Sequence, residues 1–503
     1  MTKDNAISYY KETVKKLKAF QYIAFLASWD SQTQAPKESF GLESEQLGLL
    51  SEMQYGIQTD PKFIEAINTL YEVRNELDDV LSHEIEVQHK EVEQVKKIPK
   101  EEFSEFSKLI AGAYPTWVEA KQKSDFSIFA PLLEKIIAYK KKETAWLATE
   151  DRKGYDVLLD MYEPGLTKED CDRFFGVLKE KLVPFIKKVT STELEGDFAF
   201  GDRAYPRRKQ REFCEYLRDV LCFDKNRGLM MESEHPFTTN FGTDDIRITN
   251  HYYPNNFTSA VFSVIHETGH SLYELQCDRA LNETLSGGGA SMAMHESQSR
   301  FYENMIGRSR AFWEAHYAKL QYVFPEQLED VDLDLFMKYI NRTEISFVRT
   351  AADELTYPLH IMVRYDLEKE FIENDIPVEK LPELWNQKFE EYFGVTPPDD
   401  QNGILQDVHW CYGDIGYFPT YALGSAYAAQ FFDSMNKDFD VYASLASGDT
   451  KEVNEWLKEK IHRFGSSKYP KEIIRYATGK DFDPNYYVDY LIKKYSAVYG
   501  IAD

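Results

Sequence analysis

The pattern H-E-x-x-H is the stretch of the sequence whose residue types and spacing most directly suggest chemistry. It comprises His266, Glu267 and His270, and apolar residues without proline flank it on both sides. On a helix, positions i and i+4 lie one above the other, so both imidazoles can reach one metal ion. Glu267, about 100° round the helix from His266, can stand beside that metal as a base. The pattern therefore predicts a metal-binding helix; the alternative is a pair of helix histidines that bind no metal.

A third metal ligand is expected downstream of this helix. A catalytic zinc ion takes three protein ligands and leaves one position open for water. Glu296 is the best candidate, because the glycine turn Ser286–Ala290 could bring a second helix back beside the first. His295 is the alternative ligand, and the alternative interpretation of Glu296 is a carboxylate favoured at a helix N-terminus by the dipole. We expect His266, His270 and Glu296 to hold zinc.

This ligand set predicts hydrolysis of a peptide bond. Zinc lowers the pKa of a bound water to about 7. Glu267 would take the proton of that water as it attacks a peptide carbonyl, and would then pass the proton to the leaving amine. The developing oxyanion needs a hydrogen-bond donor besides the metal. Tyr421 and His409 are the candidate donors.

The elements that position these residues are expected to be mostly helices. One β-hairpin is predicted directly before the metal helix, from His235–Asn240 and Asp245–Thr249 with turn residues between them. A strand at this place offers backbone groups along which an extended peptide can lie. A turn is expected at Tyr155–Gly165, and a helical run is expected from Val348 to about Glu373. Helical patterns cover most of the remainder: Tyr9 to about Leu50 with a break near Pro36, Phe63–Val95, Glu101–Thr149 and Thr167 to about Val189.

Composition excludes several classes of protein. The chain has 503 residues, of which 43% are hydrophobic, so it can bury a large core and is not a disordered chain. Its net charge of −26 argues against general nucleic-acid binding and against docking on anionic lipid. No stretch approaches the roughly 18 apolar residues of a membrane span. The five cysteines are scattered and never form C-x-x-C, which suits a reducing compartment, and Met1–Asn5 lacks the apolar core of a signal peptide. We expect a cytoplasmic protein, folded as a single domain over residues 1–503.

The chain resembles the carboxypeptidase Taq family, the thermostable metallocarboxypeptidases. Besides H-E-x-x-H, the resemblance rests on motifs that occur in the family's order between about residue 20 and residue 495. These motifs are His235-Pro236-Phe237, Asp245-x-Arg247-x-Thr249, His295-Glu296-Ser297-Gln298-Ser299, Arg349-x-x-Ala352-Asp353 and Gly403-x-x-Gln406-Asp407-x-His409-Trp410. Val348 stands where the family carries isoleucine, a mild apolar change.

The resemblance implies a mainly α, saddle-like protein with a deep groove and a small sheet beside the active site, related in fold to neurolysin and angiotensin-converting enzyme. It implies a homodimer that uses zinc or cobalt to remove single residues from the C-termini of peptides with broad specificity. The zinc ligands map onto His266, His270 and Glu296, and the general base maps onto Glu267. Arg349 maps onto a clamp for the terminal carboxylate of the substrate. The other groove motifs place His235, Arg247 and Gln406 among the substrate-binding residues.

Two further points stay open at the level of the sequence. Many related zinc peptidases carry an aspartate four residues after the glutamate ligand, where it orients a ligand histidine. This chain has Arg300 there, so the partner of the zinc histidines is undetermined, and Asp353 is a candidate.

The second open point is the function class. A zinc oligoendopeptidase or dipeptidase on the same scaffold is the nearer alternative, and a non-catalytic peptide-binding helical protein is the more distant one. Arg349 favours the carboxypeptidase, because removal of one terminal residue requires recognition of a free carboxylate; its alternative role is an ion pair with Asp353. Glu267 argues against a binding protein, since binding a peptide needs no base.

Overall fold

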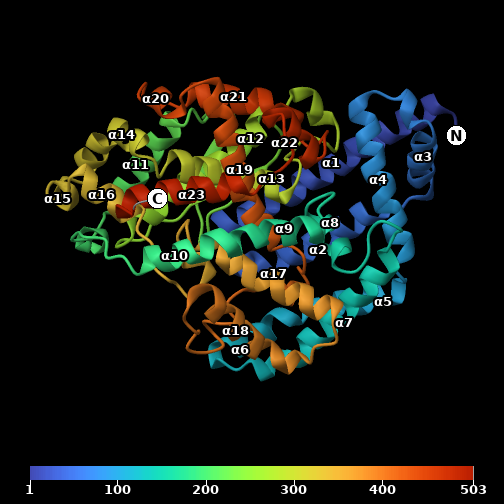
Figure 1. Cartoon of the computed structure of the whole chain (residues 1–503). Helices are drawn as coiled ribbons and strands as arrows, with labels where there is room; N and C mark the ends of the chain where they lie inside the picture. The colour runs from blue at the N-terminus through green and yellow to red at the C-terminus, as the bar shows by residue number, and fades with distance from the viewer. Residues whose placement is uncertain (502–503) are drawn as a thin grey trace.

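The computed structural model describes residues 1–501, which fold into helices and one small sheet (Figure 1). The expected helical run at the N-terminus is confirmed, with Pro36 in the break between its two helices. The first four helices include a hydrophobic cluster of their own, formed around Tyr10, Phe63 and Ile85. They are α1 (Lys3–Thr33), α2 (Phe40–Gln58), α3 (Pro61–Glu72) and α4 (Asp79–Lys97). A single domain over the whole chain therefore stays a prediction.

The main core begins with α6 and continues to the C-terminal helix. In Figure 1, α6, α7 and α18 lie at the lower edge, α14 to α16 lie at the left, and α3 and α4 lie at the right with the N-terminus. The helices before the sheet are α5 (Lys100–Ala111), α6 (Ala113–Lys123), α7 (Ala130–Leu147), α8 (Tyr155–Tyr162), α9 (Lys168–Val177), α10 (Val183–Thr190) and α11 (Arg207–Val220). Those after the sheet are α12 (Phe257–Gln276), α13 (Met292–Arg300), α14 (Arg310–Val323), α15 (Pro325–Leu328), α16 (Leu333–Ile340), α17 (Tyr357–Glu373), α18 (Leu381–Phe393), α19 (Pro419–Asp438), α20 (Val441–Leu445), α21 (Lys451–Lys460), α22 (Pro470–Thr478) and α23 (Asn485–Tyr499).

Helix α12 carries the H-E-x-x-H pattern through the interior of the protein. Fourteen of its twenty residues are buried, so the helix is surrounded by protein on nearly every side. The side chain of Asn256 caps its N-terminus by accepting a hydrogen bond from the Ser259 amide. His266 and His270 therefore project from adjacent turns of a helix that has little freedom to move.

The predicted hairpin is confirmed, and it belongs to a three-stranded sheet. Strands β2 (Thr238–Asn240) and β3 (Ile246–Asn250) pair antiparallel, with Thr238 opposite Ile248. Strand β1 (Gly228–Glu232), which the sequence did not indicate, pairs parallel with β3 on its other side. The strand order β1-β3-β2 leaves β2 at an edge of the sheet.

Two expectations about secondary structure are wrong. Tyr155–Tyr162 forms helix α8 rather than a turn, because Tyr155, Leu158 and Leu159 share a buried face and Gly154 lets the chain turn into the helix. The helix expected from Val348 begins only at Tyr357, and Arg349–Ala351 form a single 3-10 turn. The Asp353 carboxylate accepts hydrogen bonds from the amides of Leu355 and Thr356, which holds the segment before α17 in a turn.

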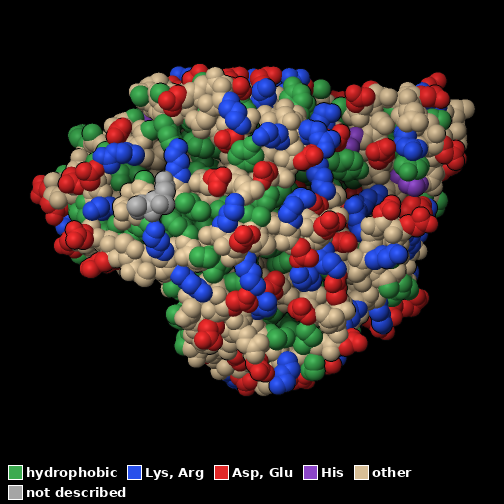
Figure 2. All heavy atoms as spheres, in the orientation of Figure 1, with side chains coloured by type: hydrophobic (Ala, Val, Ile, Leu, Met, Phe, Trp, Pro, Cys, Tyr) green, Lys and Arg blue, Asp and Glu red, His purple; other side chains and the backbone are tan. Residues whose placement is uncertain are grey.

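Charged side chains of both signs are interspersed over the face seen in Figure 2, and neither sign forms a continuous area on that face. No helix within residues 1–501 is long and apolar enough to cross a membrane.

Candidate metal centre and active site

Helices α12 and α13 bring the three predicted ligands together. One ligand atom each from His266, His270 and Glu296 lies within 4.8 Å of the other two. The Nε2 atoms of His266 and His270 lie 3.7 Å and 3.6 Å from Oε2 of Glu296. Gly269, between the two histidines, makes the close approach of the helices possible, because a Cβ there would lie 2.7 Å from the carbonyl oxygen of Gln298. The donor set of two imidazoles and one carboxylate is one that suits a catalytic zinc ion.

The charges around these ligands also fit a divalent cation. Four carboxylates on α12, α13 and the turn after α13 are buried or nearly buried: Glu267, Glu274, Glu296 and Glu303. Two guanidiniums contact this group, those of Arg300 and Arg308. With neutral histidines, the acids exceed the guanidiniums by two charges. A divalent ion held by the three ligands would balance that excess in a region where unpaired charge is costly.

Glu303 orients the first histidine. Its Oε2 lies 2.9 Å from Nδ1 of His266, so the ring turns Nε2 toward Glu296. Burial would raise the pKa of Glu303, but Arg300, His266 and Arg308 hold it well below its usual range. Glu303 therefore stays ionised and accepts the Nδ1 proton, which strengthens the ring as a ligand.

The expectation that Asp353 plays this part is wrong. Its carboxylate accepts hydrogen bonds from backbone amides around the start of α17, including that of Glu344, and contacts neither histidine. Glu303 lies in a turn of π-helix, Phe301–Ile306, that directly continues α13. Its position seven residues after Glu296, two turns further on the same helical face, is a sequence signal that could have identified it.

His295, the alternative ligand, does not join the cluster. Its Nδ1 lies 2.6 Å from Nδ1 of His270, and its Nε2 lies 2.6 Å from Oε1 of Glu274. Both ring nitrogens are thus engaged on the side of His270 that faces away from Glu296. Oε1 of Glu296 accepts a hydrogen bond from Arg300, and this interaction directs its Oε2 toward the histidines.

Glu267 stands beside the ligands with one oxygen held and the other available. Its Oε2 accepts a hydrogen bond of 2.6 Å from the Thr238 hydroxyl on β2. Burial raises the pKa of Glu267 above its ordinary value, although nearby His266 lowers it. A carboxylate with a raised pKa and a free Oε1 is suited to take up a proton and to give it back.

Arg349 lies in a buried cluster of charges near the ligands. Its Nε and Nη2 atoms donate to Asp407, its Nη1 donates to the hydroxyl of Tyr357, and the guanidinium of Arg300 stacks on the ring of Tyr357. Asp407 also accepts from Arg364, which is 1% exposed. Burial would raise the pKa of Asp407, but Arg364 and Arg349 keep it well below its usual range. Two buried guanidiniums thus share one carboxylate, and Asp353, the partner in the alternative role of Arg349, forms no ion pair with this arginine.

The guanidinium of Arg349 still has donors to offer. A guanidinium carries five N–H groups. The contacts with Asp407 and Tyr357 use three of them, which leaves one N–H on each terminal nitrogen. The segment Thr350–Asp353, which follows Arg349, lines the same cavity as His266 and Glu267. A carboxylate that enters from this side could accept both remaining hydrogens.

Gln406 holds Arg349 from behind. Its Oε1 accepts from the Arg349 amide at 2.8 Å, and its Nε2 donates to the carbonyls of Phe347, Asn402 and Gly403. The side-chain amide is therefore satisfied by backbone groups.

His235 and Arg247 lie at the sheet. His235 is exposed, and its carbonyl accepts from the hydroxyl of Ser233. Arg247 pairs with Asp245 and stacks on the rings of Phe241 and Trp29, which join α1 to the sheet. The structure brings neither side chain to the metal ligands.

Tyr421 and His409 lie on the Arg349 side of the ligands. The Tyr421 ring stacks on the guanidinium of Arg349, and its hydroxyl lies 3.5 Å from Nε2 of His409. Burial lowers the pKa of His409 to about 4, so its ring is neutral at pH 7. Burial raises the pKa of Tyr421 far above its usual range. Its hydroxyl therefore keeps its proton and can serve as a hydrogen-bond donor.

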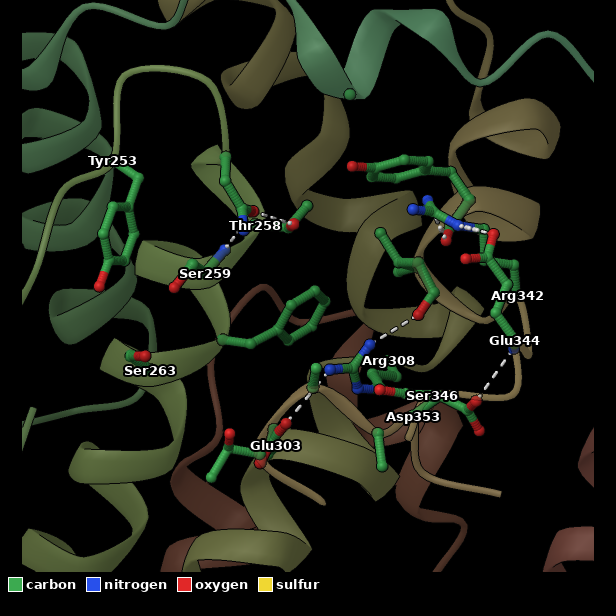
Figure 3. Close-up of a pocket in the computed structure, with 18 of the residues that line it drawn as sticks. Tyr253, Thr258, Ser259, Ser263, Glu303, Arg308, Arg342, Glu344, Ser346 and Asp353 are labelled. Atoms are coloured by element: carbon green, nitrogen blue, oxygen red, sulfur yellow. Dashed lines mark hydrogen bonds and ion pairs between the residues drawn. The ribbon is translucent and has the colours of Figure 1, made fainter. Parts of the chain in front are cut away.

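A cavity of about 1130 Å³ opens beside His266 and Glu267. Thr258, Ser259 and Ser263 of α12 form one wall, and Arg342, Glu344 and Asp353 lie on the opposite wall (Figure 3). Arg308 lies between the walls and donates to Glu303 and to the carbonyl of Ile340. Hydrogen-bonding groups thus line a cavity that reaches His266, one of the three predicted ligands, and Glu267.

Known proteins of one family match almost the whole chain. A family model described as carboxypeptidase Taq (M32) metallopeptidase matches residues 9–495. Carboxypeptidase 1 of Bacillus subtilis is 43% identical over 489 residues, which cover 97% of each chain. Thermostable carboxypeptidase 1 of Pyrococcus furiosus is 36% identical over 490 residues, 96% of each chain. The M32 carboxypeptidase structure from Deinococcus radiodurans R1 superimposes with a TM-score of 0.95 at 32% identity, over 99% of this chain and 100% of that one.

Proposed function

The chain belongs to the carboxypeptidase Taq (M32) metallopeptidase family and is a metal-dependent carboxypeptidase; from this premise we propose how it acts. It releases single residues from the free C-termini of peptides, with broad tolerance of side chains. Zinc is the proposed metal, cobalt is a possible substitute, and His266, His270 and Glu296 are the ligands. Glu267 is the proposed general base, and Arg349 is the proposed clamp for the terminal carboxylate.

The main support for cleavage at the C-terminus is the excess positive charge at Arg349. Arg349, Arg364 and Asp407 form a buried group with a net charge of +1, close to the ligands through the contacts of Arg300 and Tyr357. Burial of an unbalanced guanidinium is costly unless an anion reaches it. The free C-terminal carboxylate of a peptide supplies that anion, and an internal peptide bond does not. This difference favours a carboxypeptidase over an oligoendopeptidase.

We propose that the backbone of the substrate binds along strand β2. It lies at the edge of the sheet, and Thr238 on this strand contacts Glu267. An extended peptide can add to such an edge through main-chain hydrogen bonds. With its carboxylate at Arg349, the last peptide bond of the substrate would then lie beside Glu267.

In the proposed reaction Glu267 transfers a proton, and Tyr421 donates a hydrogen bond. A divalent metal, when bound, supplies a Lewis acid that acidifies a water and polarises the scissile carbonyl. Oε1 of Glu267 takes one proton from the attacking water as the new C–O bond forms. The Tyr421 hydroxyl donates a hydrogen bond to the oxyanion. Glu267 then returns its proton to the departing amine nitrogen as the C–N bond breaks, which leaves a shortened peptide and a free amino acid.

Mass spectrometry of a mixed peptide pool tests this function. After incubation with the zinc-loaded protein, each peptide should lose residues one at a time from its C-terminus. Removal of the metal with a chelator should stop the release, and added zinc should restore it. Fragments from internal cleavage, or loss of two residues at once, would contradict the proposal and favour the endopeptidase or dipeptidase alternative.

We also propose that two copies associate through α2. None of the nineteen residues of this helix is buried, although Leu42, Leu49 and Met53 are more than half exposed. Helices in proteins depend on packing for their stability, and an apolar face of this kind marks a contact surface. Residues 38–61 include five acidic and no basic residues, which disfavours an anionic membrane as the partner.

Light scattering tests the dimer. The wild-type protein should have twice the chain mass of 58.7 kDa, and Leu49→Glu combined with Met53→Glu should give the chain mass alone. A monomeric wild-type protein would contradict the proposal. The cytoplasm is the proposed compartment, which the five free cysteines support.

A further inference from the structure

His295 and the glycine run before it are two features that the proposed catalysis leaves unused. His295 directly precedes the ligand Glu296 but is not a ligand itself. Its Nδ1 lies 2.6 Å from Nδ1 of the ligand His270, and its Nε2 lies 2.6 Å from Oε1 of Glu274. A continuous hydrogen-bonded chain thus runs from Glu274 through His295 to His270.

Chemistry fixes the direction of this chain once His270 binds a metal. The Nε2 atom of His270 faces Glu296 and must offer its lone pair, so the proton of the ring is on Nδ1. That proton is donated to Nδ1 of His295, which must therefore be bare. The proton of His295 is then on Nε2 and is donated to Glu274, whose carboxylate only accepts. One arrangement of protons satisfies all three groups.

Glu274 is a fixed end of the chain. It is 5% exposed, and its Oε2 accepts a hydrogen bond of 2.5 Å from the side-chain Nδ2 of Asn240 on β2. Its Oε1 also accepts from the backbone amide of Gly289 at 3.2 Å. Strand β2 and the glycine run therefore hold the carboxylate from two sides.

Gly289 is an independent observation that points to His295, because this position leaves room for the imidazole ring. A Cβ at this position would lie 2.5 Å from Cδ2 of His295 and 3.0 Å from Cε1 of Tyr273. Only a residue without a side chain lets the backbone pass directly against the imidazole. The glycine run thus encloses the ring of His295 while its amide fixes Glu274.

We propose that His295 is a positioning residue that holds the Nδ1 proton of His270 and so presents the Nε2 lone pair of His270 to the metal, with Glu274 as the anchor. The two ligand histidines then differ in their support. His266 is held directly by the carboxylate of Glu303, whereas His270 is held through a second imidazole. This inference rests on the proposed metal centre.

Zinc affinity, measured by competition with a chromogenic chelator, tests the proposal without a readout of activity. His295→Phe removes both polar atoms, and His295→Gln keeps a donor near Glu274 but no acceptor near His270. Each should raise the zinc dissociation constant about 10- to 100-fold, as expected for a residue that orients a ligand. His295→Asn places an acceptor oxygen near the position of Nδ1, and it should recover part of that loss.

Three controls separate this effect from others. His316→Asn removes a buried histidine whose Nδ1 contacts the Tyr216 hydroxyl, away from the ligands, and should leave zinc affinity unchanged. The melting temperature of each metal-free variant reports whether it folds. Gly289→Ala keeps every polar group but displaces the His295 ring, so it should weaken zinc binding. This variant also tests the proposal if the His295 variants do not fold.

Zinc affinity within twofold of wild type in His295→Phe, His295→Gln and Gly289→Ala would overturn the inference. Equal losses in His295→Asn and His295→Gln would also overturn it, because only the packing of the ring would then matter. A wild-type protein that binds no zinc would instead contradict the proposed metal centre.

Discussion

At the scale of single residues, hydrogen bonds from neighbouring side chains orient the groups proposed to bind the metal or to move a proton. Thr238 holds Oε2 of Glu267, and Arg300 holds Oε1 of Glu296. Glu303 holds Nδ1 of His266 and leaves Nε2 toward the metal position. Such support orients reacting groups before the substrate arrives, so less free energy is lost in ordering them during the reaction.

Glu267→Gln tests the base. The amide keeps the size and the hydrogen bond to Thr238 but cannot take up a proton. We expect kcat to fall at least about 100-fold, while the zinc content stays that of the wild-type protein. Turnover by a zinc-loaded variant near the wild-type rate would remove Glu267 from the mechanism.

Asp407→Asn tests the support of the proposed clamp. Arg349 loses its paired acceptor oxygens and is left beside Arg364 without a shared carboxylate. We expect kcat/KM for peptides with a free C-terminus to fall at least about 10-fold, with most of the loss in KM.

Asp366→Asn is the matched control for Asp407→Asn. Asp366, on α17, also pairs with a cation and a tyrosine, Lys388 and Tyr392 of α18, but no ion pair joins it to Arg349 or Arg364. An unchanged KM in Asp407→Asn, or equal effects of the two substitutions, would show that the buried charge group does not act on the substrate.

At the scale of elements, the contacts that fix the site come from segments far apart in the sequence. The cluster of His266, His270 and Glu296 could be predicted, because i and i+4 spacing and a glycine turn are local signals. Glu303 was missed because the partner was expected four residues after Glu296, whereas Glu303 lies seven residues after it, in the π-helical turn that continues α13. Asp407 could not be assigned to Arg349 from spacing, since 58 residues separate them. Strand β1 and helix α8 were missed because tertiary packing, rather than alternation or capping, decides their conformation.

Glu163 shows how an element is held in place. Its buried carboxylate accepts a hydrogen bond from the Ala293 amide in the first turn of α13, the helix of Glu296, and another from the Tyr427 hydroxyl. Burial raises the pKa of Glu163 to about 7. Because the folded protein binds this proton more tightly than the unfolded chain does, the stabilisation is present below about pH 4.5 and is lost as the pH rises to 7.

Glu163→Gln tests this pH dependence in the metal-free protein. The amide cannot ionise, so the variant should lack this contribution at every pH. Between pH 5 and pH 8 we expect the wild-type free energy of unfolding to fall by about 2–3 kcal/mol more than that of the variant. Melting temperatures across the pH range measure the difference. Parallel curves for the two proteins would mean that folding does not raise the pKa of Glu163.

At the scale of the whole molecule, the fold surrounds one reactive centre with a cavity, a sheet edge and a buried charge group. The mainly α architecture and the family could be predicted from motifs spread along the chain, and both are confirmed. The position of Arg349 beside the proposed metal site could not, because it depends on where the turn of Arg349 packs against Asp407 and Tyr357. The proposed recognition of the C-terminal carboxylate therefore depends on tertiary packing.

The comparison of free and amidated C-termini tests this account most directly. For one peptide in the two forms, kcat/KM of the wild-type protein should be about 30- to 1000-fold higher with the free carboxylate, equivalent to about 2–4 kcal/mol. The Arg349→Ala protein should lose most of that preference, because its site no longer presents the paired donors. Equal wild-type rates on the two forms would contradict the account, and so would a preference that survives in Arg349→Ala.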